Sequence, residues 1–149
     1  MNKTVYERIS SKEILIALVN KNDEVVWESS KSPASSLFKA YYAGELNNLG
    51  ELSLYSNQAG LAVALISPEL SVKECYAIRM SEVGLEKFKE NQVEVHYEEL
   101  IPLVKSSKDD TKVCPVERFL SEHNDEERWN YMEQNFKNAT STGVGCGIF

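Results

Sequence analysis

The sequence has few of the residues that mark a secreted or membrane-spanning protein. Its 149 residues include three cysteines, Cys75, Cys114 and Cys146, and no two of them have metal-ligand spacing. A small, odd number of cysteines argues against a disulfide framework and predicts a reducing compartment. The longest apolar runs, Ile14–Val19 and Leu61–Ile66, are too short to cross a bilayer. The polar N-terminus also lacks the apolar core of a signal peptide. We therefore expect a cytoplasmic protein.

Positive charge is also scarce. Lysine and arginine total 16 against 23 aspartates and glutamates, so the formal net charge is −7, and no basic run is present. Nucleic-acid backbones and anionic membranes both need a cationic face, so neither is expected as a partner. A glycine-rich phosphate loop, a Gly-x-Ser-x-Gly elbow and a His-Glu-x-x-His pair are absent from the sequence. These absences predict no cofactor.

Hydrophobic periodicity predicts an α/β domain whose mixed sheet lies between helices. The run Ile14–Val19 is continuous, which is typical of a strand covered on both faces. Ser32-Pro33 has the pattern of a helix N-cap followed by proline. The strands after Ile66 should be parallel neighbours joined by a crossover helix. The predicted helices cover residues 1–10, 33–43, 54–66, 82–91, 115–121 and 125–137, and the predicted strands cover 14–19, 25–27, 72–80 and 93–97.

The chain shows no internal repeat and no internal domain boundary. Residues 1–138 are therefore predicted to form a single domain. Residues 139–149 hold three glycines and small polar side chains, which predict a flexible tail. The tail ends in Cys146-Gly-Ile-Phe149, a loose match to a prenylation box, so Cys146 is a candidate lipidation site. No basic stretch supports lipidation, and without it no membrane partner is expected.

The segment Val113–Arg118 carries the most specific local pattern in the sequence. Because proline favours the first position of a helix, Cys114 is predicted as the N-cap and Glu117 as the third helical residue. Free N–H groups at a helix start stabilise a thiolate, so Cys114 is a candidate nucleophile. The alternative is that Cys114 is a small buried residue closing a loop and that Glu117 is half of a capping arrangement.

A zinc site involving Cys114 is not expected. Zinc deaminases pair a His-x-Glu segment with Pro-Cys-x-x-Cys. Here His96-x-Glu98 lies in a stretch that alternates like a strand, and Pro115 follows Cys114 where the deaminase motif has it before the cysteine. A Cys114–His96 pair remains open, since spacing in the sequence cannot test it.

The order of elements and the Cys114-Pro115-x-Glu117 segment together resemble a prokaryotic family catalogued as domain of unknown function 1893. This family is placed in the cytidine deaminase-like superfamily. The resemblance runs from about Glu13 to about Met132, and the Cys-Pro-x-Glu segment is its most specific part. The other matching stretches are residues 15–28, 60–64, 72–77, 81–82, 93–102 and 109–111.

The resemblance implies a three-layer α/β/α sandwich with a mixed sheet and without zinc ligands. The segment that would carry the deaminase His-x-Glu reads Gln-Ala-Gly-Leu-Ala over 58–62, and the turn that would carry Pro-Cys-x-x-Cys reads Ser-Glu-Val-Gly over 81–84. Leu61 stands where the family usually has a basic residue, and Ser56 where it usually has an acidic one. Asp110 and Lys112 interrupt a loop that is usually glycine-rich. These departures imply a lost or altered ligand.

Two hypotheses remain open for the function, and whether the protein is an enzyme is open with them. The first is a small-molecule or thiol-dependent pocket with Cys114 as its candidate catalytic residue. The second is a catalytically inactive protein-interaction module. The predicted ligand-binding residues are Ser56, Gly60, Asp109, Thr111, Cys114 and Glu117.

Overall fold

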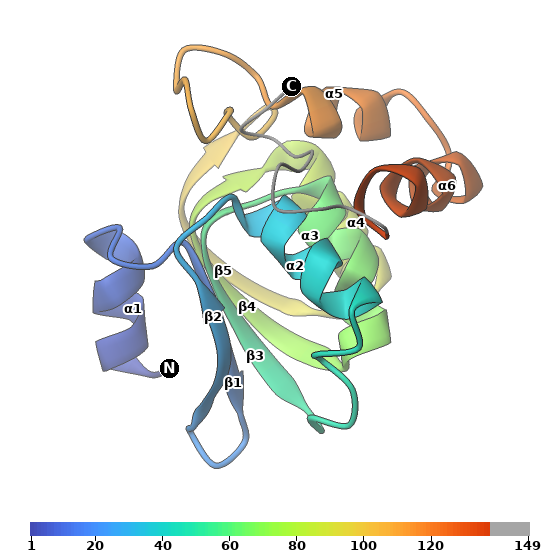
Figure 1. The fold of residues 1–149 in the computed structure, drawn as a ribbon. Coiled ribbons are helices and arrows are strands. Elements are labelled where there is room, and N and C mark those ends of the chain that lie inside the picture. Colours follow the sequence, from blue (N-terminus) through green and yellow to red (C-terminus); the bar gives the residue numbers. More distant parts are fainter. Residues whose placement is uncertain (138–149) are drawn as a thin grey trace.

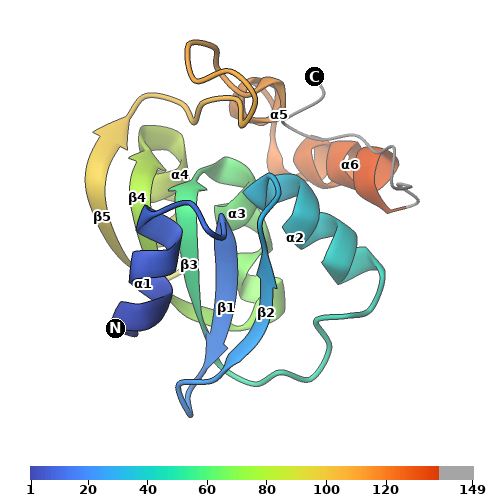
Figure 2. The same ribbon diagram turned by 60° about the vertical axis from the view of Figure 1, so that its left-hand side comes forward.

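A computed structural model of the chain describes residues 1–137, in which five strands form one sheet with helices on both faces (Figures 1 and 2). A 3-10 turn at Ser67–Leu70 extends the third helix. The helices are α1 (Lys3–Ser10), α2 (Pro33–Tyr42), α3 (Leu61–Ile66), α4 (Glu82–Glu90), α5 (Pro115–Ser121) and α6 (Asp125–Phe136). The strands are β1 (Ile16–Asn20), β2 (Val25–Ser29), β3 (Leu52–Ala59), β4 (Val72–Ser81) and β5 (Glu94–Ile101).

The sheet is mixed, with strand order β2-β1-β3-β4-β5. Strand β1 is antiparallel to β2 and to β3, while β3, β4 and β5 are parallel to one another. Strands β2, β3, β4 and β5 therefore all run in the same direction and end at one edge of the sheet. We call this edge the C-terminal edge. Helices α2, α3 and α4 follow β2, β3 and β4 in the chain, so their N-termini gather there (Figure 2).

The sheet has two different faces. Helices α2, α3 and α4 lie on one, and the short α1 lies on the other (Figures 1 and 2). Strand β1 is covered on both, because Ile16 and Leu18 belong to the main core under the helices while Ala17 and Val19 pack on the α1 side. This double coverage confirms the prediction from the continuous apolar run at Ile14–Val19.

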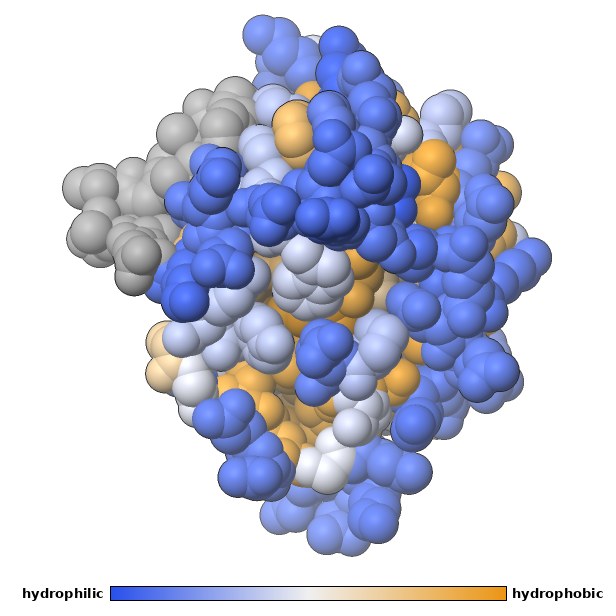
Figure 3. Space-filling model, turned by 90° about the vertical axis from the view of Figure 1, so that its right-hand side faces the viewer, coloured by the Kyte–Doolittle hydropathy of each residue, from blue (hydrophilic) through white to orange (hydrophobic). Residues whose placement is uncertain are grey.

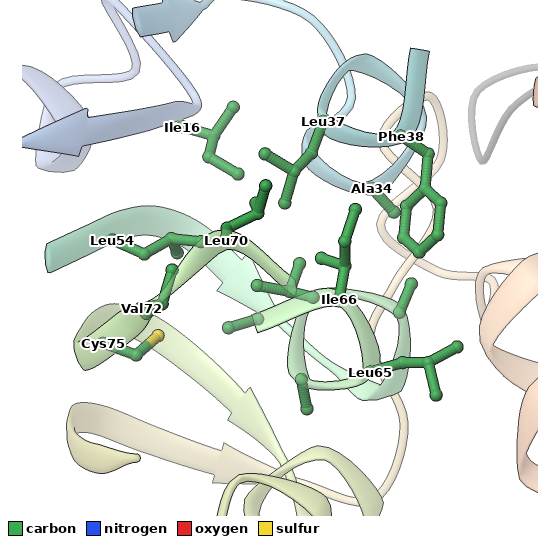
Figure 4. Packing of buried hydrophobic residues seen from close by; sticks show 14 of the residues in the cluster. Ile16, Ala34, Leu37, Phe38, Leu54, Leu65, Ile66, Leu70, Val72 and Cys75 are labelled. Carbon is green, nitrogen blue, oxygen red and sulfur yellow. The ribbon is translucent and has the colours of Figure 1, made fainter. Parts of the chain in front are cut away.

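The main core fills the space between the sheet and the helices α2 and α3. Figure 4 shows side chains from both layers of this core, with Leu37, Phe38 and Ile66 from the helices and Leu54 and Cys75 from the sheet. Helix α6 adds buried side chains from the outside of the helical layer. On the side of α6, apolar atoms lie in hollows between hydrophilic residues (Figure 3). Burial of these apolar side chains is the main force that holds α2 and α3 on the sheet.

One predicted element is wrong. Residues 54–66 were expected to form a single helix, whereas Leu52–Ala59 is the central strand β3 and only Leu61–Ile66 is helical. Leu52 and Leu54 are buried in the main core while Tyr55 packs on the α1 side, which is the alternation of a strand. Ala59 and Gly60 mark the sharp turn from β3 into α3, whereas Ala62 and Ala64 lie within α3 itself.

The remaining predicted elements are confirmed within a few residues, including the strands β1 and β2 and the parallel pair β4–β5. The fold is thus an α/β fold with a mixed sheet, as expected. The predicted boundary at residue 138, the tail 139–149 and Cys146 lie outside the described residues. No helix within residues 1–137 has the length and apolar character needed to cross a membrane.

Candidate functional site

A narrow cleft opens at the C-terminal edge of the sheet, where three helices begin. Its walls include the N-cap residues of α2, α3 and α5, which are Ser32, Gly60 and Cys114. The segment between β5 and α5 arches over this edge (Figure 1). In sheets with parallel strands, ligands bind outside the carboxyl ends of the strands. The cleft therefore lies where a ligand site is expected.

The cleft has an inner cavity and an outer chamber. The inner cavity has a volume of about 30 Å³, and Val104, Lys105 and Glu117 are among its walls. A cavity needs roughly 10–15 Å³ on this measure to hold one water molecule, so the inner cavity takes only a small group. The outer chamber of about 240 Å³ adjoins it. Pro33, Gln58 and Ser107 line both spaces.

Glu117 is a carboxylic acid in the protein interior, with 2% of its surface exposed. Its carboxylate accepts hydrogen bonds from the backbone N–H of Leu61 at 2.8 Å and of Val104 at 3.2 Å, and it also hydrogen-bonds the Ser81 side chain. Burial raises the pKa of Glu117, although these hydrogen bonds and the nearby Arg128 oppose the shift. Glu117 thereby ties the start of α5 to the start of α3 and to the end of β4.

Two glycines let the starts of α3 and α4 approach Glu117. A β-carbon at Gly60 would lie 2.6 and 2.7 Å from the Glu117 carboxylate oxygens. One at Gly84, in the first turn of α4, would lie 2.7 Å from the Gly60 backbone. Both distances are shorter than van der Waals contact allows. The Ser81 hydroxyl completes this junction by accepting a 3.0 Å hydrogen bond from the Gly84 N–H.

The N-terminus of α2 has unused hydrogen-bonding groups. Ser32 is its N-cap, but the Ser32 side chain makes no capping hydrogen bond. Within residues 1–137, Ser32 Oγ is the one buried side-chain nitrogen or oxygen without a hydrogen-bond partner. The N–H groups of Ala34 and Ser35 belong to the first turn, where a helix offers no intrahelical acceptor. Buried polar atoms usually have partners, so an unpartnered one in a cleft wall indicates a bound water or ligand.

The loop over the cleft is held from below and from one side. The Gln58 side chain accepts from the Lys105 N–H at 2.8 Å and donates to the Lys105 carbonyl at 3.1 Å. At the far end of the loop, both guanidinium NH groups of Arg79 donate to Asp110. This pair holds the pKa of Asp110 below its usual range. The segment from Val104 to Cys114 is therefore tied to β3 and β4 at two points.

The structure brings together some of the predicted ligand-binding residues and leaves others apart. Gly60, Cys114 and Glu117 line the inner cavity. Ser56 is buried in β3 and donates to the Gln58 carbonyl, so it supports the strand end without lining the cleft. Asp109 accepts from the N–H and hydroxyl of Thr111, at 3.0 and 2.6 Å. Asp109 and Thr111 thus build the turn at the tip of the loop, and neither lines the cleft.

Cys114 is the predicted N-cap of α5, and its side chain is fully buried in the main core. This position therefore does not provide an accessible nucleophilic thiol. The candidate Cys114–His96 pair does not form. His96 stacks on Tyr76 at a ring-centroid distance of 4.7 Å, and Tyr76 packs on the α1 side of the sheet. Cys114 lies on the opposite side, under the helices.

His96 belongs instead to an exposed group with Glu74 and Glu94 on the α1 side. Its Nε2 lies 3.5 Å from a Glu94 oxygen and 4.0 Å from a Glu74 oxygen. This group is separate from the cleft. Exposed acidic groups are common without a bound ion, so we assign no metal to this group.

Sequence reasoning missed the polar walls of the cleft. Gln58, Lys105 and Ser107 carry no recognisable motif, and Ser32 was predicted only as a helix start. Ser32 could have been predicted as a site residue from its position after β2, because β2 ends at the edge where the cleft opens. That placement required the direction of β2 relative to β3, which the erroneous helix at 54–66 concealed.

The comparisons with known proteins agree with this architecture. The sequence matches the family described as "Domain of unknown function (DUF1893)" over residues 7–136. The chain belongs to the DUF1893 family. A crystal structure of a DUF1893 family protein from Thermotoga maritima is similar to it, with a TM-score of 0.69 and 20% sequence identity over 90% of this chain and 88% of that one. At this identity the likeness shows a shared fold. No curated protein matched the sequence.

The region matched by the DUF1893 family spans the whole cleft, from Ser32 on α2 to Glu117 on α5. The Gly60–Glu117 junction therefore lies within the shared domain and not in an addition to it. The family description names no ligand, so the chemistry of the cleft has to be inferred from its walls.

Proposed function

We propose that the protein is a small-molecule-binding domain whose ligand enters the cleft between α2, α3 and the loop before α5. The observation that carries the proposal is Ser32 Oγ, a buried hydroxyl without a hydrogen-bond partner in the cleft wall. The cavity and chamber together fall just below the ~300–1,000 Å³ of typical ligand sites. The ligand is accordingly small.

The walls suit a polar ligand. Ser32 Oγ and the α2 amides offer hydrogen bonds at one end of the cleft, and Ala62, Val63 and Val104 are apolar walls of the inner cavity. Such a combination of apolar walls with few polar groups is common in ligand sites. Of the residues that the structure describes, Glu117 is the one buried acid in the wall that could take part in a reaction of the bound molecule.

The fold is, in our proposal, a zinc-free relative of the cytidine deaminase-like fold. The turns that begin α3 and α4 meet at the C-terminal edge, and the resemblance to deaminases implies that their zinc ligands lie at the corresponding two segments. Gly60 and Gly84 occupy this junction in place of metal-binding side chains, and the Glu117 carboxylate lies against them. On this view an internal carboxylate supports the junction that zinc supports elsewhere.

A fragment screen by ¹H–¹⁵N NMR tests the binding proposal. We expect bound fragments to shift the amide signals of Ala34, Gln58 and Lys105. Ser107→Trp places a large side chain at an exposed position in the mouth and should abolish these shifts. Asn47→Trp is the matched control, because Asn47 is equally exposed but lies beyond the other end of α2. Fragments that bind only elsewhere, or equally well to Ser107→Trp, would refute the proposal.

The interaction-module hypothesis retains one specific observation. Strand β5 is an edge strand, and Tyr97 and Leu100 on it are 41% and 42% exposed. Exposed apolar side chains on an unpaired strand edge favour association with another chain. Size-exclusion chromatography with light scattering tests for self-association through this edge. A monomer whose elution is unchanged by Tyr97→Lys would remove this support.

A further inference from the structure

We propose that the ligand of the cleft carries an oxyanion, phosphoryl or carboxylate, and that this group binds at the N-terminus of α2. The inference rests on the proposed small-molecule function and names the chemical class of the ligand. It joins two separate observations, the unpartnered Ser32 hydroxyl and a local excess of lysine around the cleft mouth.

Helix α2 supplies the donors. It has ten residues, and its positive end is formed by the N–H groups of Ala34 and Ser35 beside Ser32 Oγ. Pro33 has no N–H and is the one first-turn residue that needs no acceptor. Helix N-termini of this kind bind phosphate and carboxylate groups, because the free N–H groups and the helix dipole both favour negative charge. The Ser32 hydroxyl is buried and unpartnered, so its O–H can donate a hydrogen bond to a ligand oxygen.

The charge at the mouth points the same way. Lys105 lines the inner cavity, and Lys12 and Lys108 line the outer chamber. Among residues 1–137, the one carboxylate that lines that chamber is Asp110, which is already paired with Arg79. Three lysines around one cleft are unexpected in a protein with a net charge of −7. A local excess of one sign of charge in a cleft concentrates ligands of the opposite sign.

Glu117 is the counter-argument, because it is a carboxyl group in the same wall. Its two oxygens are engaged by the N–H groups of Leu61 and Val104, and burial raises its pKa, which favours the neutral form. The two backbone N–H groups therefore already offset the negative charge that an incoming oxyanion would meet. The inner cavity of about 30 Å³ also matches a compact headgroup better than a ring system.

The test is an NMR titration of the whole chain with inorganic phosphate and, in a second arm, with acetate, both at constant ionic strength. We expect saturable shifts of the Ala34 and Ser35 amide signals. Lys105→Gln should weaken binding about threefold to tenfold, and Ser32→Ala about fivefold, the loss of about one hydrogen bond. Lys39→Gln is the matched control, because it removes the same charge from the other end of α2.

The outcomes separate the inference from the proposed function. Saturation by phosphate supports a phosphoryl ligand, and saturation by acetate alone supports a carboxylate. Shifts that do not saturate, or that Lys39→Gln reduces as much as Lys105→Gln, show an adventitious ion only and overturn the inference. If neutral fragments occupy the cleft while both anions fail, the function stands and the inference fails. If fragments and anions all fail, both are wrong.

Discussion

The backbone N–H of Leu61 donates a 2.8 Å hydrogen bond to Glu117 Oε1, across 56 positions of the chain. Leu61 opens α3 and Glu117 lies in the first turn of α5, so the bond joins two helix starts. Glu117 also accepts from the N–H of Val104, three residues after the end of β5. A single buried side chain thus holds the start of α3, the covering loop and α5 together at the rim of the cleft.

Glu117→Gln should lower the free energy of unfolding, because an amide NH₂ would face one of the two backbone donors. The expected cost is about 1–3 kcal/mol in mildly acidic buffer. Burial raises the folded-state pKa of Glu117 above its ordinary value of 4.5, so its contribution is complete below that value and is lost as pH rises through the folded-state pKa. Urea unfolding from pH 4.5 to 8 should therefore show the gap between wild type and variant narrowing as pH rises.

A gap that widens with pH would contradict this reading. It would mean that the hydrogen bonds to Glu117 outweigh its burial and lower the folded-state pKa. Comparing the two proteins at each pH matters, because Asp110 and Asp125 have lowered pKa values and lose stabilising charge in acid. Those groups are common to both proteins and cancel in the difference.

The glycine junction predicts a distinctive double-mutant result. Gly60→Ala and Gly84→Ala should each destabilise the fold by about 1–3 kcal/mol, since a β-carbon would overlap its neighbours. The clash at Gly60 includes the Glu117 side chain, whereas the closest atoms at Gly84 are backbone. Glu117→Ala should therefore relieve part of the Gly60→Ala cost and none of the Gly84→Ala cost. Equal coupling of both glycines to Glu117 in thermal unfolding would refute this arrangement.

Gln58 should control the mobility of the loop over the cleft. Gln58→Ala removes both hydrogen bonds to the Lys105 backbone, and Gln58→Glu keeps the acceptor while removing the donor. Amide hydrogen exchange of residues 105–113 should speed up in both variants, more in Gln58→Ala. The exchange of β4 should stay unchanged and serves as the internal control. Unaltered exchange in the loop would show that the Arg79–Asp110 pair and the Val104–Glu117 hydrogen bond hold it without Gln58.

Cys75 should be unreactive in the folded protein. Its side chain is fully buried in the main core, and burial raises the pKa of its thiol. Alkylation by iodoacetamide at pH 8, followed by mass spectrometry, should leave Cys75 unmodified until denaturant is added. Modification of Cys75 under native conditions would indicate opening of the sheet between β3 and β5.

The sequence predicted most of the fold because the hydrophobic periodicity of each segment agreed with the residues that begin and end it. Ser32-Pro33 predicted the start of α2, and the Cys114-Pro115-x-Glu117 segment predicted the start of α5. Strand β3 was missed because its period-2 pattern is interrupted by Ser56 and Asn57 and runs into the helical stretch after Gly60. Local sequence preference alone therefore favoured a single helix over residues 54–66. Pairing with β1 and β4 makes the first part of this segment the central strand.

The candidate site was only partly predictable for a related reason. Glu117 could be found from its capping position, but its partner Leu61 is far away in the chain and depends on β3 being a strand. Lys105 and Ser107 lie in a loop without periodicity, so only the tertiary fold places them opposite Ser32.

The most direct test of an oxyanion site at α2 is X-ray diffraction from crystals soaked in selenate, whose selenium scatters anomalously. We predict an anomalous peak in the cleft, with selenate oxygens about 3 Å from Ser32 Oγ and from the Ala34 nitrogen. The peak should be absent from crystals of Ser107→Trp. Selenate bound only at surface lysines, with an empty α2 N-terminus, would contradict the assignment of the cleft as an oxyanion site.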